Sequence, residues 1–176
     1  MFPNSLHVAE FPAKSVSIND LKAYENKLYM QTGWRPDVVV LDYVDEIKAY
    51  KNLKTHESQA EIVVDFRAWM QEKPGKCGFT ATQVNRSGTS TPIIDEGELA
   101  DSFGKIRKVD ACYSLNQNDT ERAQGVMRIW VMKQRNGRSK YLFHVKSSFS
   151  NCQFSEIDPT VFEQIMAQAR EKTMER

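Results

Sequence analysis

The sequence predicts an α/β fold in which a mostly parallel sheet is flanked by helices and followed by a C-terminal antiparallel β-hairpin. Three observations carry this prediction. Strand-like and helix-like segments alternate along residues 6–115, which is typical of parallel strands joined by helical crossovers. Residues 38–41 form an unbroken apolar run, as in strands that are buried on both faces. Asn136-Gly137 lies between two apolar segments and is a strong hairpin signal.

The composition is that of an ordinary folded protein. The chain has 176 residues, 40% of them hydrophobic, and a net charge of +1, which is enough for a domain with its own core. No apolar run approaches the roughly 20 residues of a membrane helix, and the N-terminus lacks a secretory signal pattern. We therefore expect no membrane partner and a cytoplasmic location. The cysteines, which have no CxxC pairing, are expected to be small buried side chains rather than zinc ligands: Cys77, Cys112 and Cys152.

The N-terminal third contains a short predicted strand and a helix. Residues 6–11 read as a strand. Ser17 predicts a helix N-cap, and Asp20 lies at the third helical position. Leu21, Tyr24 and Leu28 recur at helical spacing until Gly33, where we expect the helix to end.

A second strand and helix follow. Residues 37–42 predict a central parallel strand, and residues 46–58 are polar and loop-like. Residues 59–72 predict a helix that ends at Pro74-Gly75. Its apolar face is formed by Ile62, Val63, Phe66, Trp69 and Met70.

The rest of the chain alternates in the same way. We expect strands at 78–83, 110–115, 126–133 and 141–145, a Ser/Thr/Gly-rich loop at 86–92, and helices at 95–105 and 159–176. The strand at 110–115 is expected to be parallel to its predecessors. The strands around Asn136-Gly137 should add an antiparallel hairpin to the edge of that sheet.

Two predicted strands end at residues that suit nucleotide chemistry. Asp42 follows a buried parallel strand, at the end where open α/β sheets bind ligands. In nucleotide motors such a carboxylate holds the water shell of Mg²⁺ beside the phosphates. Gln83 ends the next strand, and a neutral amide there can sense a γ-phosphate. Each residue is also consistent with an ordinary polar strand end.

The hairpin carries a pair of cations. Lys133 and Arg135 are two residues apart, so on a strand they project to the same side. Two cations on a rigid support can stabilise charge on a transferring phosphoryl group. With Arg138 and Lys140 nearby, the alternative is a solvated basic turn or a nonspecific phosphate patch.

Taken together and in this order, these segments resemble the DnaB-type hexameric helicases of the RecA-like superfamily, most closely phage-like members. The resemblance covers residues 5–146. It is carried by VVVLDY at 38–43, TQVNR at 82–86, LADSFGKIRKVDA at 99–111 and KQRNG at 133–137. It implies a RecA-like P-loop NTPase fold, with residues 1–150 as the C-terminal portion of a motor domain and 151–176 as a tail with a helix.

The resemblance also implies roles at the nucleotide. Asp42 would be the Walker B acid that positions Mg²⁺ through water, and Gln83 would be the sensor that couples the nucleotide state to DNA loops. Lys133 and Arg135 would reach the ATP of a neighbouring subunit, with Arg135 as the arginine finger. The implied cofactors are therefore ATP and Mg²⁺.

Residues 86–108 would include the loop that faces the channel of a homohexameric ring and holds single-stranded DNA by its phosphates. The motif suggests Arg86, Asp101, Ser102 and Gly104 as DNA-binding residues, and charge alone adds Lys105, Arg107 and Lys108. Ala100 and Phe103 depart from the family pattern. The family also implies primase as a partner, in the host cytoplasm if the gene belongs to a phage.

The sequence lacks one motif that such a motor needs. The pattern GxxxxGK[ST], which cradles the β- and γ-phosphates, does not occur. The only Gly-Lys pairs are Gly75-Lys76 and Gly104-Lys105, and neither has the required earlier glycine or a following hydroxyl residue. We therefore expect a fragment, a split-gene product or a degenerate relative, with negligible ATPase activity in isolation.

Two other functions fit much of the same pattern. A different RecA-like ATPase, such as a recombinase or a clock-type protein, would share the acid and the glutamine, and only the hairpin motif argues against it. A non-catalytic binding or assembly module would keep the subunit-facing surface alone. In that case Arg135 would still act on a neighbouring molecule.

Overall fold

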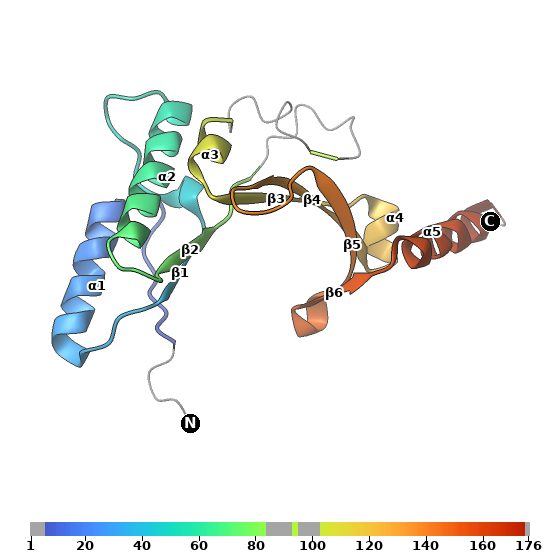
Figure 1. Cartoon of the computed structure of the whole chain (residues 1–176), viewed down its shortest axis with the longest axis horizontal. Helices are drawn as coiled ribbons and strands as arrows, with labels where there is room; N and C mark the ends of the chain where they lie inside the picture. The colour runs from blue at the N-terminus through green and yellow to red at the C-terminus, as the bar shows by residue number, and fades with distance from the viewer. Residues whose placement is uncertain (1–5, 84–92, 95–102, 175–176) are drawn as a thin grey trace. The chain divides into compact units, whose positions relative to one another are not determined.

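The computed structural model describes residues 6–83, 93–94 and 103–174. The chain forms two compact units. Unit 1 contains the described residues up to 83 together with 103–109, and unit 2 contains residues 93–94 and 110–174. Figure 1 labels their elements. Within these described ranges no helix is long and apolar enough to cross a bilayer.

Helix α1 (Ile18–Thr32) begins and ends where the sequence predicts. The Ser17 hydroxyl accepts the Asp20 N–H at 3.2 Å, and the Asp20 carboxylate accepts the Ser17 N–H at 2.8 Å, which completes a capping box. Gly33 adopts a left-handed conformation with φ +70°, and its N–H donates to the Tyr29 carbonyl at 2.7 Å. Local side-chain chemistry therefore determines both ends of this helix.

Unit 1 contains a two-stranded parallel sheet. Strand β1 (Val38–Leu41) pairs in parallel with β2 (Cys77–Thr80), in a register from Val38–Cys77 to Leu41–Thr80. Helix α2 (Thr55–Gln71) lies between them in the chain. A β-carbon placed on Gly78 would lie 2.7 Å from the Phe66 ring of α2, so the glycine allows β2 and α2 to approach closely.

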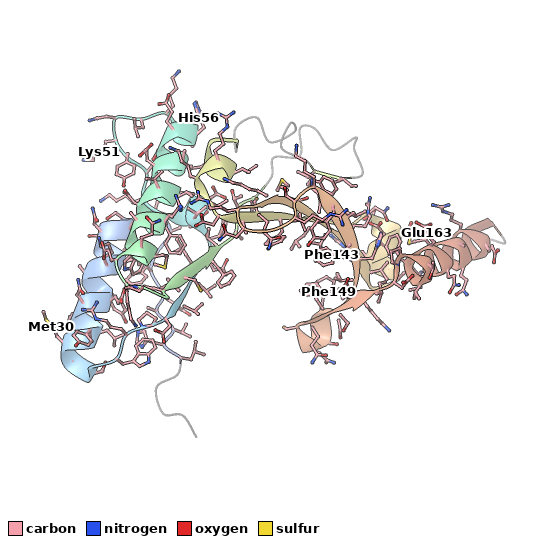
Figure 2. The ribbon with its side chains drawn as sticks, viewed as in Figure 1. Met30, Lys51, His56, Phe143, Phe149 and Glu163 are labelled. Carbon is pink, nitrogen blue, oxygen red and sulfur yellow. The ribbon has the colours of Figure 1, made fainter. Side chains whose placement is uncertain are left out.

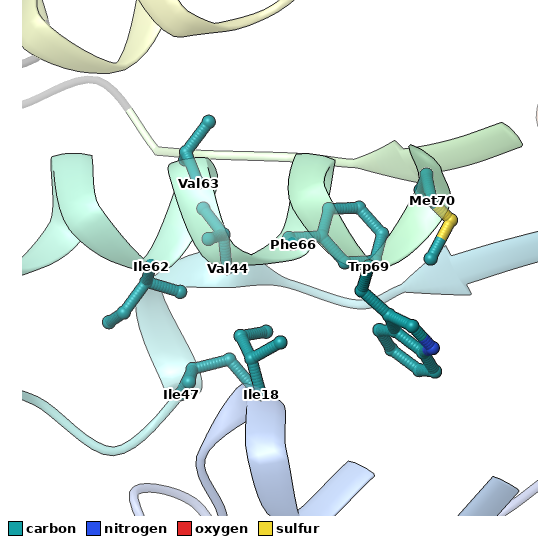
Figure 3. Packing of buried hydrophobic residues seen from close by; sticks show 8 residues of the cluster. All are labelled: Ile18, Val44, Ile47, Ile62, Val63, Phe66, Trp69 and Met70. Carbon is teal, nitrogen blue, oxygen red and sulfur yellow. The ribbon is translucent and has the colours of Figure 1, made fainter. Parts of the chain in front are cut away.

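The predicted apolar face of α2 is confirmed as the centre of the core of unit 1. Its members pack with Ile18 from α1 and with the 3₁₀ turn η1 (Val44–Glu46) that follows β1. Val39 and Leu41 pack against the same core. Figure 3 shows the buried set, which is Ile18, Val44, Ile47, Ile62, Val63, Phe66, Trp69 and Met70.

The opposite face of the β1–β2 sheet is open among the described residues. Val38, Val40 and Phe79 are 51%, 71% and 61% exposed, whereas Val39 packs against the core. The prediction that β1 is buried on both faces is therefore wrong for the described part of the chain. Helices cover one face only, and we call the other face the open sheet face.

A buried polar network joins α1, α2 and the segment before β2. The Glu25 carboxylate accepts from the Trp69 indole N–H at 2.8 Å and from the Lys76 ammonium at 2.5 Å. The side chains of Glu25 and Lys76 are 8% and 3% exposed. The ammonium also lies 4.5 Å from the centroid of the Trp69 ring. Because each charge is paired, its burial is tolerated.

Unit 2 is built on a four-stranded antiparallel sheet in the order β3-β4-β5-β6. Its strands are β3 (Ala111–Asn116), β4 (Val126–Gln134), β5 (Tyr141–Ser148) and β6 (Gln153–Ile157). Helix α4 (Asp119–Ala123) and the turn η4 (Phe149–Asn151) connect strands, and α5 (Pro159–Met174) follows β6. Phe162 and Met166 of α5 form a core with Val126 of β4.

The structure confirms the hairpin of β4 and β5 but changes the pairing of β3. The predicted strand at 110–115 exists, yet it pairs antiparallel with β4 and not with a parallel neighbour. The predicted C-terminal helix is also confirmed. Residues 153–157, which were not predicted as a strand, pair with β5, so the segment interpreted as a tail contributes to the sheet.

Other local predictions were wrong or lie outside the described residues. Residues 6–11 do not form a strand. They contact α1 through aromatic side chains: His7 hydrogen-bonds the Tyr24 hydroxyl at 2.7 Å, and Phe11 lies edge-on to the Tyr24 ring. Cys77 and Cys152 are exposed rather than buried. Of the predicted helix at 95–105, residues 95–102 fall outside the described ranges.

Exposed apolar side chains also occur away from the open sheet face. Figure 2 shows Met30 on α1 and Phe149 in η4, which are 85% and 62% exposed. Single exposed apolar residues of this kind are normal on soluble proteins.

Candidate functional site

Asp42 and Gln83 follow the carboxyl ends of two neighbouring parallel strands. Asp42 comes directly after Leu41, and Gln83 lies three residues beyond Thr80, which pairs with Leu41. Both residues are exposed. Because the strands are parallel and adjacent, the acid and the amide leave the sheet at the same edge. Of the predicted catalytic residues, Asp42 and Gln83 belong to unit 1, and Lys133 and Arg135 belong to unit 2.

The Thr80 side chain links the two strand ends by hydrogen bonds. Its hydroxyl donates to the Leu41 carbonyl at 2.9 Å and accepts the Val44 N–H at 3.0 Å. The peptide bond between Asp42 and Tyr43 is cis. The two hydrogen bonds of Thr80 hold the segment that carries Asp42 to the end of β2 as well as to β1.

A second acid binds the end of β2. The Asp45 carboxylate accepts the Gln83 N–H at 3.1 Å, the Thr82 hydroxyl at 2.7 Å and the Lys105 ammonium at 2.6 Å. Lys105 belongs to helix α3 (Phe103–Lys108) and also donates to the Thr82 hydroxyl at 2.8 Å. We call Asp45, Thr82 and Lys105 the strand-end clamp.

The strand-end clamp pairs an anion, Asp45, with a cation, Lys105. Burial alone would raise the pKa of Asp45, but the hydrogen bonds from Lys105 and Thr82 outweigh it and leave that pKa below its usual value. The Asp45 and Lys105 side chains are 15% and 7% exposed. Asp45 is therefore an anion at neutral pH whose acceptor capacity is directed at protein donors, whereas Asp42 remains exposed to solvent.

The exposed Asp42 suits a hydrated cation. Mg²⁺ keeps several waters and is usually bound through one or two carboxylates together with substrate phosphates. One exposed carboxylate at the carboxyl end of a parallel strand fits that mode. The described residues contain no cluster of His, Cys, Asp and Glu side chains that could hold a metal ion by itself.

The predicted DNA-binding residues have different surroundings. Arg107 and Lys108 are exposed on α3. Lys105 is buried in the strand-end clamp, so its geometry does not support a direct contact with DNA. A β-carbon on Gly104 would lie 3.2 Å from Ala60 of α2, which gives this glycine a packing role. Arg86, Asp101 and Ser102 lie outside the described residues.

The hairpin cations belong to unit 2. The Arg135 Nε lies 3.0 Å from Asp110 Oδ1, and these side chains are 49% and 56% exposed. The Arg135 N–H also donates to the Asp110 carbonyl at 2.8 Å. Arg135 is therefore held at the surface by an exposed ion pair, an interaction that is typically worth less than ~1 kcal/mol.

Lys133 follows an irregularity in the sheet. Cys112 pairs with Lys133, but Tyr113 pairs with Val131, so Met132 is an extra residue on β4. Val131 and Met132 are consequently buried in succession, which breaks the alternation of the strand. Lys133 is half-buried.

Comparison with known proteins identifies the fold. No protein-family model matches the sequence, and no curated protein matches it. Among solved structures, a DnaB-like replicative helicase, described together with its interactions with primase, superposes with a TM-score of 0.67 at 14% identity over 81% of this chain. A second solved structure, described as an ATPase domain, superposes with a TM-score of 0.61, also at 14% identity over 81% of this chain.

This chain has a RecA-like α/β fold. The likeness at this identity shows the fold alone. The chain spans 36% of the DnaB-like helicase chain and 52% of the second chain.

Sequence reasoning found Asp42 and Gln83 but missed the side chains that organise the segments around them. No local sequence pattern distinguishes Thr80 or Asp45 from other polar residues near strand ends. Lys105 was noticed only for its charge. Asp45 and Lys105 are 60 residues apart in the chain, so no local pattern could have indicated that they meet.

Proposed function

We propose that the chain is part of a DnaB-like, ATP-dependent replicative helicase motor that translocates on single-stranded DNA. The observation that carries the proposal is the placement of Asp42 and Gln83 at adjoining ends of parallel strands. In a RecA-like fold this is the ligand-binding edge of the sheet. This placement supports the proposal that Asp42 and Gln83 belong to an ATP-binding edge.

Asp42 and Gln83 would have different tasks at this edge. The Asp42 carboxylate would hold the water shell of Mg²⁺, and the bound ion would neutralise charge on the ATP phosphates. The Gln83 amide would hydrogen-bond near the terminal phosphate and distinguish ATP from ADP. Neither residue cradles the β-phosphate, and the sequence contains no GxxxxGK[ST] loop to do so. A polypeptide with such a loop would have to complete the site.

Arg135 would act on a second subunit of a hexameric ring, with Lys133 beside it. Its exposed ion pair with Asp110 is weak enough to be exchanged for a phosphate. An arginine finger that acts in trans contributes about 10³–10⁵-fold to hydrolysis in other nucleotide motors. The basic side chains of Arg107 and Lys108 on α3 would contact DNA phosphates. The family motif adds Arg86, Asp101, Ser102 and Gly104 from the same stretch as DNA-binding residues. Primase would be a further partner, in the cytoplasm of the host if the gene is a phage gene.

Steady-state ATP hydrolysis by the isolated chain tests the part played by the absent loop. We expect turnover at background level in the presence of Mg²⁺, both with and without single-stranded DNA, because the phosphates have no cradle. Robust turnover would contradict this expectation.

Mixing experiments test the role in trans. We expect the chain to change the ATPase rate of a complete DnaB-like replicative helicase, and we expect Arg135→Ala to abolish the change. Arg138→Ala is the matched control, since Arg138 lies beyond the same hairpin turn but stacks near Tyr141. No change with the unmodified chain, or an equal loss in both variants, would count against the proposal.

A further inference from the structure

We propose that Asp45 and Lys105 are positioning residues that fix the strand end carrying Gln83 to helix α3. The inference rests on the proposed function only for the meaning of Gln83 as a nucleotide sensor. The coupling itself is a property of unit 1 and involves neither nucleotide nor DNA.

The hydrogen bonds of the clamp form a closed cycle. Asp45 Oδ2 accepts from the Thr82 hydroxyl and from the Gln83 N–H, and Asp45 Oδ1 accepts from the Lys105 ammonium. Lys105 closes the cycle with its 2.8 Å bond to the Thr82 hydroxyl. The backbone at Gln83 is therefore one bond away from the carboxylate on which α3 is anchored. A displacement at either end must break or bend charge-assisted hydrogen bonds.

Burial distinguishes this pair from an ordinary surface ion pair. Lys105 is 5% exposed as a residue, whereas Arg107 and Lys108 on the same short helix are exposed. A buried ion pair contributes little net stability compared with an apolar replacement, but the loss of one partner is costly. A pair of this kind defines one arrangement of the segments that it joins more than it stabilises the fold.

The clamp also connects to Asp42. Asp45 lies three residues beyond Asp42, in the η1 turn whose Val44 belongs to the core. The segment after β1, the segment after β2 and helix α3 are thus all connected through the part-buried Asp45 carboxylate. A change of hydrogen bonding at Gln83 would pass through Asp45 to Lys105 and so to α3, the described part of the predicted DNA-contact stretch.

The test is amide hydrogen exchange at residue resolution on the full chain without ligands. In Lys105→Met we expect the Gln83 N–H to exchange about tenfold faster or more, because its acceptor loses the cation that orients it. Lys108→Met is the matched control, an exposed lysine on the same helix, and should leave that rate unchanged. Unchanged exchange at Gln83 in Lys105→Met, or equal acceleration in both variants, would overturn the inference.

A reciprocal variant separates coupling from simple destabilisation. Thr82→Val removes the hydroxyl but keeps the shape of the side chain, and we expect faster exchange of the α3 amides, such as that of Ile106. Amides in α1, for example that of Leu28, should stay protected in every variant. Faster exchange throughout unit 1, or α3 amides unaffected by Thr82→Val, would contradict coupling even if Lys105→Met failed to fold.

The two proposals can fail separately. If the mixing experiments show no effect on ATPase activity but the exchange rates change as expected, the clamp stands and the helicase function does not. If the chain changes the ATPase rate but Lys105→Met leaves the exchange rate of the Gln83 N–H unchanged, the helicase function stands and the clamp is refuted.

Discussion

Asp42 and Asp45 are two carboxylates only three residues apart that have different surroundings. Asp42 is exposed to solvent, whereas Asp45 accepts hydrogen bonds from Lys105, Thr82 and Gln83. The type of residue alone does not predict this difference, because it depends on the positions of the hydrogen-bond donors.

The lowered pKa of Asp45 has a consequence for stability in acid. A carboxyl with a folded-state pKa below its unfolded value stabilises the fold above about pH 4, and this contribution is lost as pH falls through the folded pKa. Asp45→Asn leaves the Lys105 ammonium buried without its anion, so we expect a loss of about 3 kcal/mol at pH 7. The difference between the two proteins should shrink at pH 3. Urea unfolding at both pH values measures this, and a constant difference would refute the assignment.

The surroundings of His144 disfavour a positive charge on its ring. It is on β5 beside Arg128 of β4, and its ring lies 4.1 Å from that of Phe162 on α5. Its Nδ1 is buried with no hydrogen-bond partner among the described residues. Burial lowers its pKa and Arg128 lowers it further, against the opposing effect of Glu163 on α5 and Glu121 on α4. The folded state therefore favours the neutral ring.

Acidification should weaken unit 2 through this residue. The unfolded chain binds a proton at His144 more readily than the folded chain, so stability falls as pH drops below about 6.5. We expect His144→Phe to reduce the change in unfolding free energy between pH 7 and pH 5. His56→Gln, at an exposed position on α2, is the control. The same pH slope in His144→Phe and the unmodified protein would show that His144 does not contribute.

At the scale of elements, the contact between β2 and α2 depends on Gly78, which has no side chain. Gly78 faces Phe66 and Met70, which would lie 2.7 and 2.9 Å from an added β-carbon. We expect Gly78→Ala to cost about 1–3 kcal/mol through overpacking. Gly104→Ala, where the nearest atom is the Ala60 methyl at 3.2 Å, should cost less. Chemical denaturation of both variants decides the order, and equal losses would contradict the close contact at Gly78.

A charge introduced on one face of β1 should affect stability far less than a charge introduced on the other face. Val40 is on the open sheet face, and Val39 packs against the core. We expect Val40→Lys to change the unfolding free energy by roughly 0.5 kcal/mol or less and to reduce self-association at high concentration, because it interrupts an exposed apolar patch. Val39→Lys should prevent stable folding of unit 1 because it buries an unpaired cation. Thermal unfolding and light scattering together test the pair.

Elements with local signals were predicted well. Ser17, Asp20 and Gly33 mark the ends of α1 because capping depends on neighbouring residues alone. The pairing of β3 was not predictable in the same way, since a strand looks the same in sequence whether its partner is parallel or antiparallel. Residues 6–11 have strand-like composition, but their aromatic side chains contact α1 and no strand forms.

For the whole molecule, the sequence predicted the α/β class and the two parallel strands that precede Asp42 and Gln83. The predicted end of the second strand at Gln83 was wrong, because β2 ends at Thr80, three residues earlier. It did not predict the division into two units or the strand-end clamp, because both depend on contacts between residues far apart in the chain. The solved structures share the fold of this chain at only 14% identity. Different sequences can therefore form the same arrangement of strands.

The distribution of the three tryptophans gives each unit its own optical reporter. Trp69 lies in the core of unit 1 with its indole N–H bonded to Glu25, and Trp130 lies on β4 of unit 2. Trp34 is the remaining one and lies near His7. In a Trp34→Phe background, emission from Trp69 would follow loss of the Glu25–Lys76 network, and emission from Trp130 would follow the antiparallel sheet. Fluorescence could therefore monitor both units in one unlabelled molecule.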